Sequence, residues 1–138
     1  MSSGAKATDE CIDIYNDLKL KKAYKYIIFK MSDDSKNIVV HSTAESSTYE
    51  EFLENLPENE PRYAVYDFDY EKPGEGQRNK ITFYCWIPDV SPVRKKMLYA
   101  SSKDAIRKLL EGVAIEIQGT DATEVAYETV YEKASRSN

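Results

Sequence analysis

Basic side chains are concentrated in one stretch of the chain, residues 91–110. This stretch holds six basic residues and one acid, a local charge of +5, whereas the whole chain carries −5. The remainder of the chain therefore carries −10, and the charge is strongly segregated. Ammonium and guanidinium groups in such a cluster pair with anions rather than transfer protons, so the chemistry they indicate is association. Three partners fit: an acidic protein surface, phosphoinositide headgroups or nucleic acid.

Two apolar side chains lie among these bases. At 3.6 residues per turn, Val93 and Met97 share a line on a helix, with Arg94 and Lys96 beside it. An adaptable methionine inside a charged rim is typical of a surface that binds a partner. The pattern is equally compatible with a solvated face on which Val93 and Met97 touch a neighbouring loop, because single exposed apolar residues are normal.

A long helix must position these side chains, and its two ends are marked. Ser91 can act as N-cap and Pro92 fits the first helical position, while Gly112 follows as a stop signal. We therefore predict a helix over residues 92–110. Its opposite face is apolar and is expected to pack on the core through Leu98, Tyr99, Ser102, Ala105, Ile106, Leu109 and Leu110.

Residues that could support bond chemistry are scattered. Cys85 and His41 have no Gly-rich phosphate loop, nucleophile elbow or metal-ligand spacing around them. His41 is expected at a sheet edge, Cys85 as a buried reduced thiol, and Asp67 and Asp69 as solvated or capping carboxylates. The sequence thus predicts a protein that is not an enzyme and needs no cofactor or metal.

Length and composition fit one soluble domain. The chain has 138 residues, 41% hydrophobic and 31% charged, and no apolar run approaches the roughly 20 residues that span a bilayer. Residues 1–8 lack the apolar stretch of a secretory signal, which favours the cytoplasm. The acidic net charge and the absence of an aromatic-basic strand motif argue against nucleic acid.

Hydrophobic periodicity predicts helices and strands in the order αββαββαβα within a single domain, residues 1–138. This order favours an α/β (α+β mixed) fold in which helices cover both faces of a central mixed sheet. Residues 1–7 are expected to form a mobile arm, 71–80 a solvent loop and 135–138 a frayed tail. Predicted helices cover 9–20, 49–56, 92–110 and 123–134, and predicted strands cover 24–30, 37–41, 62–70, 81–87 and 113–118.

Several motifs, taken in order, resemble the actin-depolymerising factor/cofilin family along nearly the whole chain. They are Asp17-Leu-Lys-Leu20, Leu56-Pro-Glu-Asn59, Tyr63-Ala-Val-Tyr-Asp-Phe68, Arg78-Asn-Lys80, Trp86-Ile-Pro-Asp89, Lys96-Met-Leu-Tyr-Ala-Ser-Ser-Lys-Asp104 and Gln118-Gly-Thr-Asp121. The resemblance implies the ADF-homology fold, a mixed sheet between helices. It also implies a monomer that binds monomeric and filamentous actin, severs filaments and promotes depolymerisation, with preference for ADP-actin. The alternative is a member of this fold that binds phosphoinositides or actin-related complexes without severing.

The family's binding residues can be carried over by motif. For monomers and filaments they are Ser3, Gly4, Arg94, Lys96, Met97, Lys103, Asp104 and Arg107, to which the helix pattern adds Val93. For filaments alone they are Arg78, Lys80, Glu132, Lys133 and Arg136. Ser3 corresponds to the inhibitory phosphorylation site of many relatives, and phosphoinositides are implied as regulators at the basic helix. The implied location is the cytoplasmic actin cytoskeleton. Nuclear entry stays open but is not indicated, because residues 31–36 lack the basic import cluster of some relatives.

Overall fold

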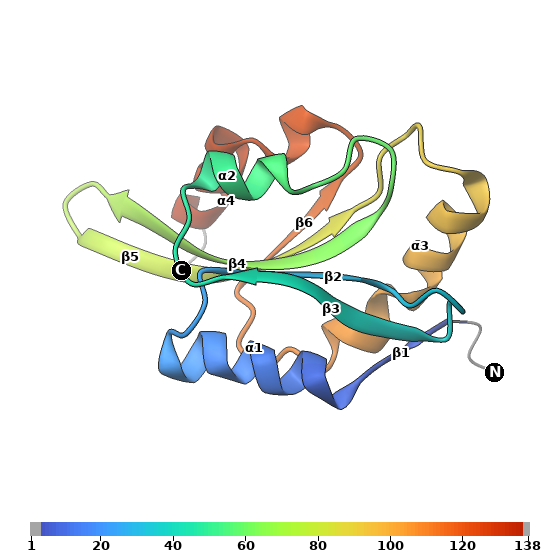
Figure 1. Cartoon of the computed structure of the whole chain (residues 1–138). Coiled ribbons are helices and arrows are strands. Elements are labelled where there is room, and N and C mark those ends of the chain that lie inside the picture. The colour runs from blue at the N-terminus through green and yellow to red at the C-terminus, as the bar shows by residue number, and fades with distance from the viewer. Residues whose placement is uncertain (1–3, 137–138) are drawn as a thin grey trace.

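A computed structural model of the chain describes residues 4–136 (Figure 1). Its centre is a six-stranded mixed sheet in the order β1-β3-β2-β4-β5-β6. The outer pairs β1/β3 and β5/β6 are parallel, and the pairs between them are antiparallel. The strands are β1 (Lys6–Ala7), β2 (Tyr26–Met31), β3 (Asn37–Ala44), β4 (Arg62–Lys72), β5 (Gly76–Trp86) and β6 (Ile115–Gly119).

Helices cover both faces of this sheet, as the element order predicted. Buried residues of α1 and α3 belong to one core cluster, and those of α2, η1 and α4 belong to a second cluster on the other face. Figure 1 shows α1 on one side of the sheet and α2 and α4 on the other. The helices are α1 (Asp9–Lys21), α2 (Tyr49–Glu54), α3 (Val93–Arg107) and α4 (Tyr127–Arg136), with a 3-10 turn η1 (Ala122–Val125). Among residues 4–136, no helix combines the length and apolarity needed to span a bilayer.

The two cores follow from the alternation of side chains on the central strands. Tyr63 and Val65 of β4 point into the α1/α3 core, whereas Ala64, Tyr66 and Phe68 point into the α2/α4 core. Successive residues of a strand face opposite sides of the sheet, so a strand buried on both faces is apolar at nearly every position. The predicted two-layer covering is therefore confirmed.

The segment predicted as a loop, residues 71–80, is mostly strand. β4 and β5 stay paired out to Lys72 and Gly76, and Gly74 in the turn and Gly76 at the start of β5 adopt positive φ. Glycine adopts this conformation without steric cost. In Figure 1 the hairpin tip extends past the helices. Because this end lies outside both cores, its residues show no apolar alternation, and the sequence pattern missed a hairpin held by backbone hydrogen bonds.

Three other boundaries differ from the predictions. The segment predicted as an arm contains strand β1, and the segment predicted as a tail is helical as far as Arg136, while residues 1–3 and 137–138 lie outside the described residues. The final helix is interrupted at Ala126, whose extended backbone (ψ 153°) separates η1 from α4. Asp121 caps η1, its Oδ1 accepting hydrogen bonds from the amides of Thr123 and Glu124. The cap at Asp121 and the extended backbone of Ala126 thus divide the segment predicted as one helix into η1 and α4.

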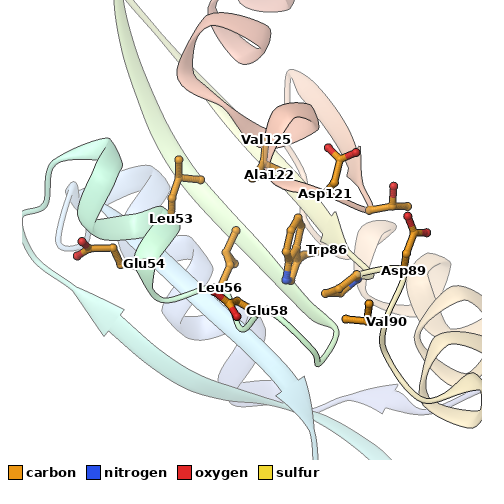
Figure 2. A pocket seen from close by; sticks show the side chains of 12 residues that line it. Leu53, Glu54, Leu56, Glu58, Trp86, Asp89, Val90, Asp121, Ala122 and Val125 are labelled. Atoms are coloured by element: carbon orange, nitrogen blue, oxygen red, sulfur yellow. The ribbon is translucent and has the colours of Figure 1, made fainter.

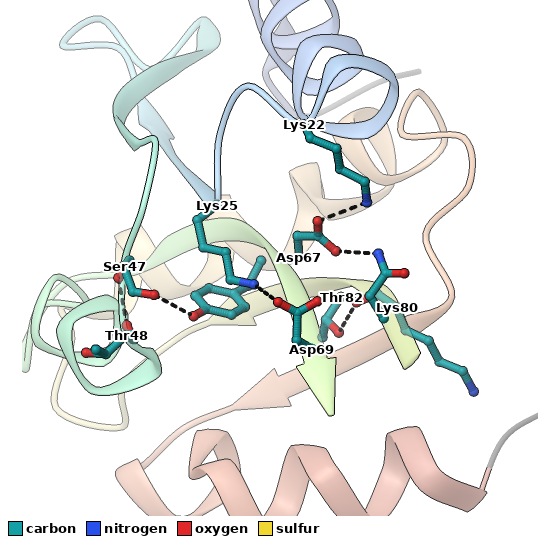
Figure 3. Close-up of polar contacts among 10 residues, drawn as sticks. Lys22, Lys25, Ser47, Thr48, Asp67, Asp69, Lys80 and Thr82 are labelled. Carbon is teal, nitrogen blue, oxygen red and sulfur yellow. Dashed lines mark hydrogen bonds and ion pairs between the residues drawn. The ribbon is translucent and has the colours of Figure 1, made fainter. Parts of the chain in front are cut away.

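Ion pairs join the end of α1 to the central hairpin (Figure 3). The Lys22 ammonium lies 3.1 Å from the carboxylate of Asp67, and the Asn79 side-chain amide donates to the other oxygen of that carboxylate. Lys25 pairs with Asp69 on the same strand. Asp67 is buried, which corrects the expectation of a solvated or capping carboxylate. The alternation of side chains along β4 could not indicate this burial, because the partners of Asp67, Lys22 and Asn79, lie outside β4.

Candidate protein-binding surface

The start of α3 is fixed by the backbone of the preceding segment. The amides of Ile87 and Asp89 donate to the carbonyls of Gly119 and Thr120, which join this segment to the end of β6. Pro92, and not Ser91, occupies the N-cap position, and the Ser91 hydroxyl is buried without a hydrogen-bond partner. The helix consequently begins at Val93, one residue later than predicted.

The inner face of α3 is anchored to the sheet. The Tyr99 hydroxyl accepts a hydrogen bond from the Met31 amide at 2.8 Å, and the Tyr63 hydroxyl donates to the Tyr99 carbonyl. The buried line consists of Tyr99, Ser102 and Ile106, followed by Leu110 in the turn after the helix. Leu98, Ala105 and Leu109, expected in the same stripe, are only half-buried. The helix is thus rotated slightly from the predicted orientation because Tyr99 reaches its hydrogen-bond partners in the sheet.

The outer face of α3 presents an apolar ridge to solvent. The side chains of Val93 and Met97 are each 67% exposed, and they form what we call the α3 ridge. Arg94 beside them is exposed and makes no ion pair within residues 4–136, whereas the Lys96 ammonium donates to the Asp89 carbonyl at 3.1 Å. Val93 and Met97 therefore do not pack on a neighbouring loop, and a cation free to pair lies next to them.

The bases at the other end of α3 already have a partner. Lys103 and Arg107 both donate to the carboxylate of Glu116 on β6, each at 3.0 Å. Hydrogen bonding to Glu116 raises the pKa of Lys103. Burial by itself raises the pKa of Glu116, but hydrogen bonds and charge from the two bases outweigh it, so the net shift is downward. Of Lys103, Asp104 and Arg107, only Asp104 is exposed. This end of the face is therefore less basic than the sequence indicated.

The N-terminal arm docks on the same helix. The Ala5 amide donates to the Ser102 hydroxyl at 2.9 Å, and Ala5 is buried. A Cβ on Gly4 would lie 2.6 Å from that hydroxyl oxygen, closer than real contacts allow. Glycine is therefore required where the arm crosses α3. The structure brings Gly4 and α3 into one surface, while Ser3 lies outside the described residues.

The predicted filament-specific residues lie on the β4–β5 hairpin and on α4. Lys80 of β5 donates to the Ala134 carbonyl of α4 at 2.9 Å, which joins the two elements directly. Lys133 donates to the Glu116 carbonyl, and the other predicted residues form short ion pairs within their own elements, Arg78 with Glu75 and Arg136 with Glu132. The two elements that carry these five residues are thus in direct contact through Lys80.

Two titratable side chains outside these surfaces, Cys85 and His41, have pKa values shifted by their surroundings. Burial raises the pKa of the Cys85 thiol to about 12, so it stays protonated and unreactive at neutral pH. Burial, together with the charges of Arg62 and Lys30, lowers the pKa of His41. No cluster of three or more potential metal ligands occurs within the described part of the chain.

Sequence reasoning missed two residues that shape the α3 surface. Ser102 was assigned to the core stripe as a small residue, but its hydroxyl holds the arm. Glu116 was an unremarkable acid in a predicted strand, and nothing in the linear pattern placed it between Lys103 and Arg107. A polar residue within an otherwise apolar helix line was the available signal for Ser102; for Glu116 there was none.

The fold and this surface define a small α/β module with an apolar ridge exposed on one helix. Comparison with known proteins identifies its class. The family model described as cofilin/tropomyosin-type actin-binding protein matches residues 4–135. Cofilin from Mycosarcoma maydis is 53% identical over 137 residues, covering 99% of each chain. Cofilin from Saccharomyces cerevisiae is 53% identical over 135 residues, covering 97% of this chain and 94% of the relative.

Solved structures agree with the sequence comparison. A Streptomyces griseoflavus cofilin superposes with a TM-score of 0.91 at 49% identity, covering 98% of this chain and all of the other. Actin depolymerization factor 2 of Plasmodium berghei superposes with a TM-score of 0.86 at 29% identity, covering 99% and 100%. The chain belongs to the cofilin family of actin-binding proteins.

Proposed function

We propose that this protein binds actin monomers and filaments in the cytoplasm, severs filaments and promotes their depolymerisation, with preference for ADP-bound subunits. The observation that carries the proposal is the α3 ridge, Val93 and Met97, exposed beside an Arg94 that forms no ion pair within residues 4–136. The N-terminal arm docks on the same helix. Family membership supplies the partner, and the ridge supplies a surface of the right kind.

The ridge suits a contact in which a helix enters an apolar groove. Burying Val93 and Met97 would remove apolar surface from water and anchor the complex, while Arg94 would pair with acids at the rim of the groove. Lys103 and Arg107 share one carboxylate, so their cluster keeps a charge of about +1. They would contribute long-range attraction more than direct pairing.

We expect severing to depend on contact with more than one actin subunit. The hairpin and α4 provide a second surface, so one molecule could touch two adjacent subunits. If binding favours an altered arrangement of those subunits, the filament equilibrium shifts toward it by the difference in binding free energy. Strain would then concentrate at the boundary between decorated and bare filament and break it there.

Two regulators fit the same surface. Phosphoinositide headgroups would be attracted by the bases of α3 and compete with actin for them. Ser3 immediately precedes Gly4, which lies against Ser102. A phosphate on Ser3 would add about −1.5 to −2 charges beside a surface meant for an acidic partner, and would weaken binding.

Co-sedimentation with actin filaments, together with disassembly of pyrene-labelled filaments, tests the proposal. The wild type should pellet with filaments. It should disassemble filaments of ADP-bound subunits faster than filaments of ATP-bound subunits. The double variant Arg94→Ala/Lys96→Ala should lose binding, while Lys21→Ala/Lys36→Ala, which removes two exposed bases elsewhere, should not.

Each outcome has a distinct meaning. A wild type that neither pellets with filaments nor accelerates their loss contradicts the function. Normal activity in a folded Arg94→Ala/Lys96→Ala variant contradicts the location of the surface. Binding without severing favours the alternative, a member of the fold that binds phosphoinositides or actin-related complexes; vesicle flotation would then identify the first of these.

A further inference from the structure

A separate cleft of about 670 Å³ opens between the end of α2, the end of β5 and the β6–η1 connection. Figure 2 shows the side chains that line it. Its apolar lining includes Leu53, Leu56, Trp86, Pro88, Val90 and Val125. Val90 is 74% exposed, the largest exposed fraction among the bulky apolar side chains of the described residues. The cleft therefore exposes apolar surface that the fold itself does not cover.

Carboxylates flank this apolar floor on both sides. Glu54 and Glu58 lie at the α2 side, and Asp89 and Asp121 lie at the opposite side (Figure 2). No lysine, arginine or histidine lines the cleft. The rim is thus uniformly acidic, the reverse of the α3 surface.

The rim charges are not neutralised from within the described chain. Asp121 accepts hydrogen bonds from η1, but the side chains of Glu54, Glu58 and Asp89 form no hydrogen bond or ion pair within residues 4–136. Two bases of α3 have partners of their own, Lys95 with Glu60 and Lys96 with the Asp89 carbonyl, and neither pairs with a rim carboxylate. Like charges around a low-dielectric floor attract cations and repel anions.

From this complementarity we infer that the cleft docks a short segment of a partner protein in which a bulky apolar side chain is flanked by basic residues. The apolar side chain would cover Val90 and contact the Trp86 ring, and the flanking bases would pair with carboxylates on either side. Nucleic acid, phosphorylated ligands and anionic membranes are disfavoured by the same rim. The inference does not depend on actin binding, because it concerns a surface of opposite charge.

Trp86 makes the cleft directly observable. It is the sole tryptophan of the chain, and its indole nitrogen donates to the Pro57 carbonyl at 2.7 Å, which holds the ring in the floor of the cleft. Its fluorescence should therefore report occupancy. The probe is a capped hexapeptide with leucine and phenylalanine at its centre and two basic residues at each end; its counterpart carries glutamates at those ends.

The wild type should show a saturable fluorescence change with the basic peptide and none with the acidic one. The triple variant Glu54→Gln/Glu58→Gln/Asp89→Asn should bind about tenfold more weakly, given modest contributions from each exposed pair. The matched triple variant Glu45→Gln/Glu111→Gln/Glu128→Gln, with the same net charge but an intact rim, should bind like the wild type. Ala122→Phe, which fills the cleft, should bind less while keeping the wild-type circular dichroism spectrum.

Three results would overturn the inference. The first is the absence of a saturable fluorescence change with the basic peptide, and the second is equal binding of the basic and acidic peptides. The third is equal weakening of peptide binding in the two triple variants, which would mean that net charge alone causes the effect. A fluorescence change that appears without peptide and grows with protein concentration would assign the cleft to a second copy of this chain instead. Co-sedimentation of Glu54→Gln/Glu58→Gln with actin filaments should be unchanged, which separates this inference from the proposed function.

Discussion

The backbone amide of Ala5 donates a hydrogen bond to the hydroxyl of Ser102, 2.9 Å away and buried, so the N-terminal arm is fixed to α3. Residues 97 positions apart in the sequence thereby become parts of one surface. The relationship explains why a small polar residue lies in the apolar line of α3: a larger side chain would displace the arm, and an apolar one would leave the amide without a partner.

Removing this hydroxyl should loosen the arm. Ser102→Ala leaves the buried Ala5 amide unsatisfied, which should lower the free energy of unfolding by about 1–2 kcal/mol, as measured by urea denaturation. Actin binding should also weaken, because the arm no longer holds its place on α3. Ser101→Ala is the matched control: its hydroxyl is exposed and bonds only within the helix. Equal effects of the two substitutions would contradict this role of Ser102.

Met97→Ala should separate binding from stability. Met97 is 67% exposed, so its truncation should leave the free energy of unfolding nearly unchanged. As a central residue of the proposed contact it should cost roughly 2 kcal/mol of actin affinity, about a 30-fold weakening. Equilibrium binding to labelled actin monomers measures the change. Leu20→Ala, which removes a similarly exposed apolar side chain on α1, should have no effect on binding.

The inner face of α3 should behave oppositely. Ile106 is fully buried, and Ile106→Ala should lower the free energy of unfolding by about 2–5 kcal/mol because it leaves a cavity in the α1/α3 core. Leu109→Ala removes a half-buried side chain and should cost distinctly less, under about 2 kcal/mol. Thermal or urea denaturation gives both values. A larger loss for Leu109 than for Ile106 would mean that the helix is rotated differently from the structure.

Glu116 should contribute to stability in a pH-dependent way. Its pKa in the folded protein is lowered from an ordinary value of 4.5, so its contribution is present above that pH and lost as pH falls through the folded pKa. The stability difference between wild type and Glu116→Gln should therefore be largest near neutral pH and shrink below pH 4.5. Urea denaturation of both proteins at several pH values measures this difference; a constant difference would exclude the ion pairs as its cause.

The hairpin should affect filaments more than monomers. Arg78→Ala/Lys80→Ala removes two bases of the second surface, including the Lys80 contact with the Ala134 carbonyl of α4. Filament binding and severing should fall, while monomer binding through the α3 ridge should persist. Co-sedimentation and a monomer-binding titration on the same preparation distinguish the two. Parallel losses in both assays would indicate a folding defect or a single shared surface.

Much of the fold could be predicted where apolar periodicity reports burial. The alternation of Tyr63 and Val65 with Ala64 and Tyr66 required a strand covered on both faces, and the structure has it. Prediction failed where backbone pairing or capping, rather than burial, decides the structure. The hairpin beyond Tyr70 continues outside both cores, and the extended Ala126 interrupts an apolar period that reads as one helix.

The candidate site shows the same division. The sequence placed Val93 and Met97 opposite the core face of α3 but left open whether they touch a neighbouring loop, and the structure shows them exposed. The state of the bases could not: Lys103 and Arg107 are held by Glu116, while Arg94 is free of ion pairs within residues 4–136. Sequence reports how many charges a segment carries, and only the spatial neighbours determine which of them remain available.

By itself the sequence determined the class of fold, the segregation of charge and the helix that carries the α3 ridge, since these depend on local spacing. The tertiary structure alone decided that Gly4 and Ala5 lie on α3, that Glu116 binds two of its bases, and that four acids surround the apolar cleft at Trp86. The reason is physical: periodicity records which side of an element is buried, whereas contacts between distant segments depend on how the sheet brings those elements together.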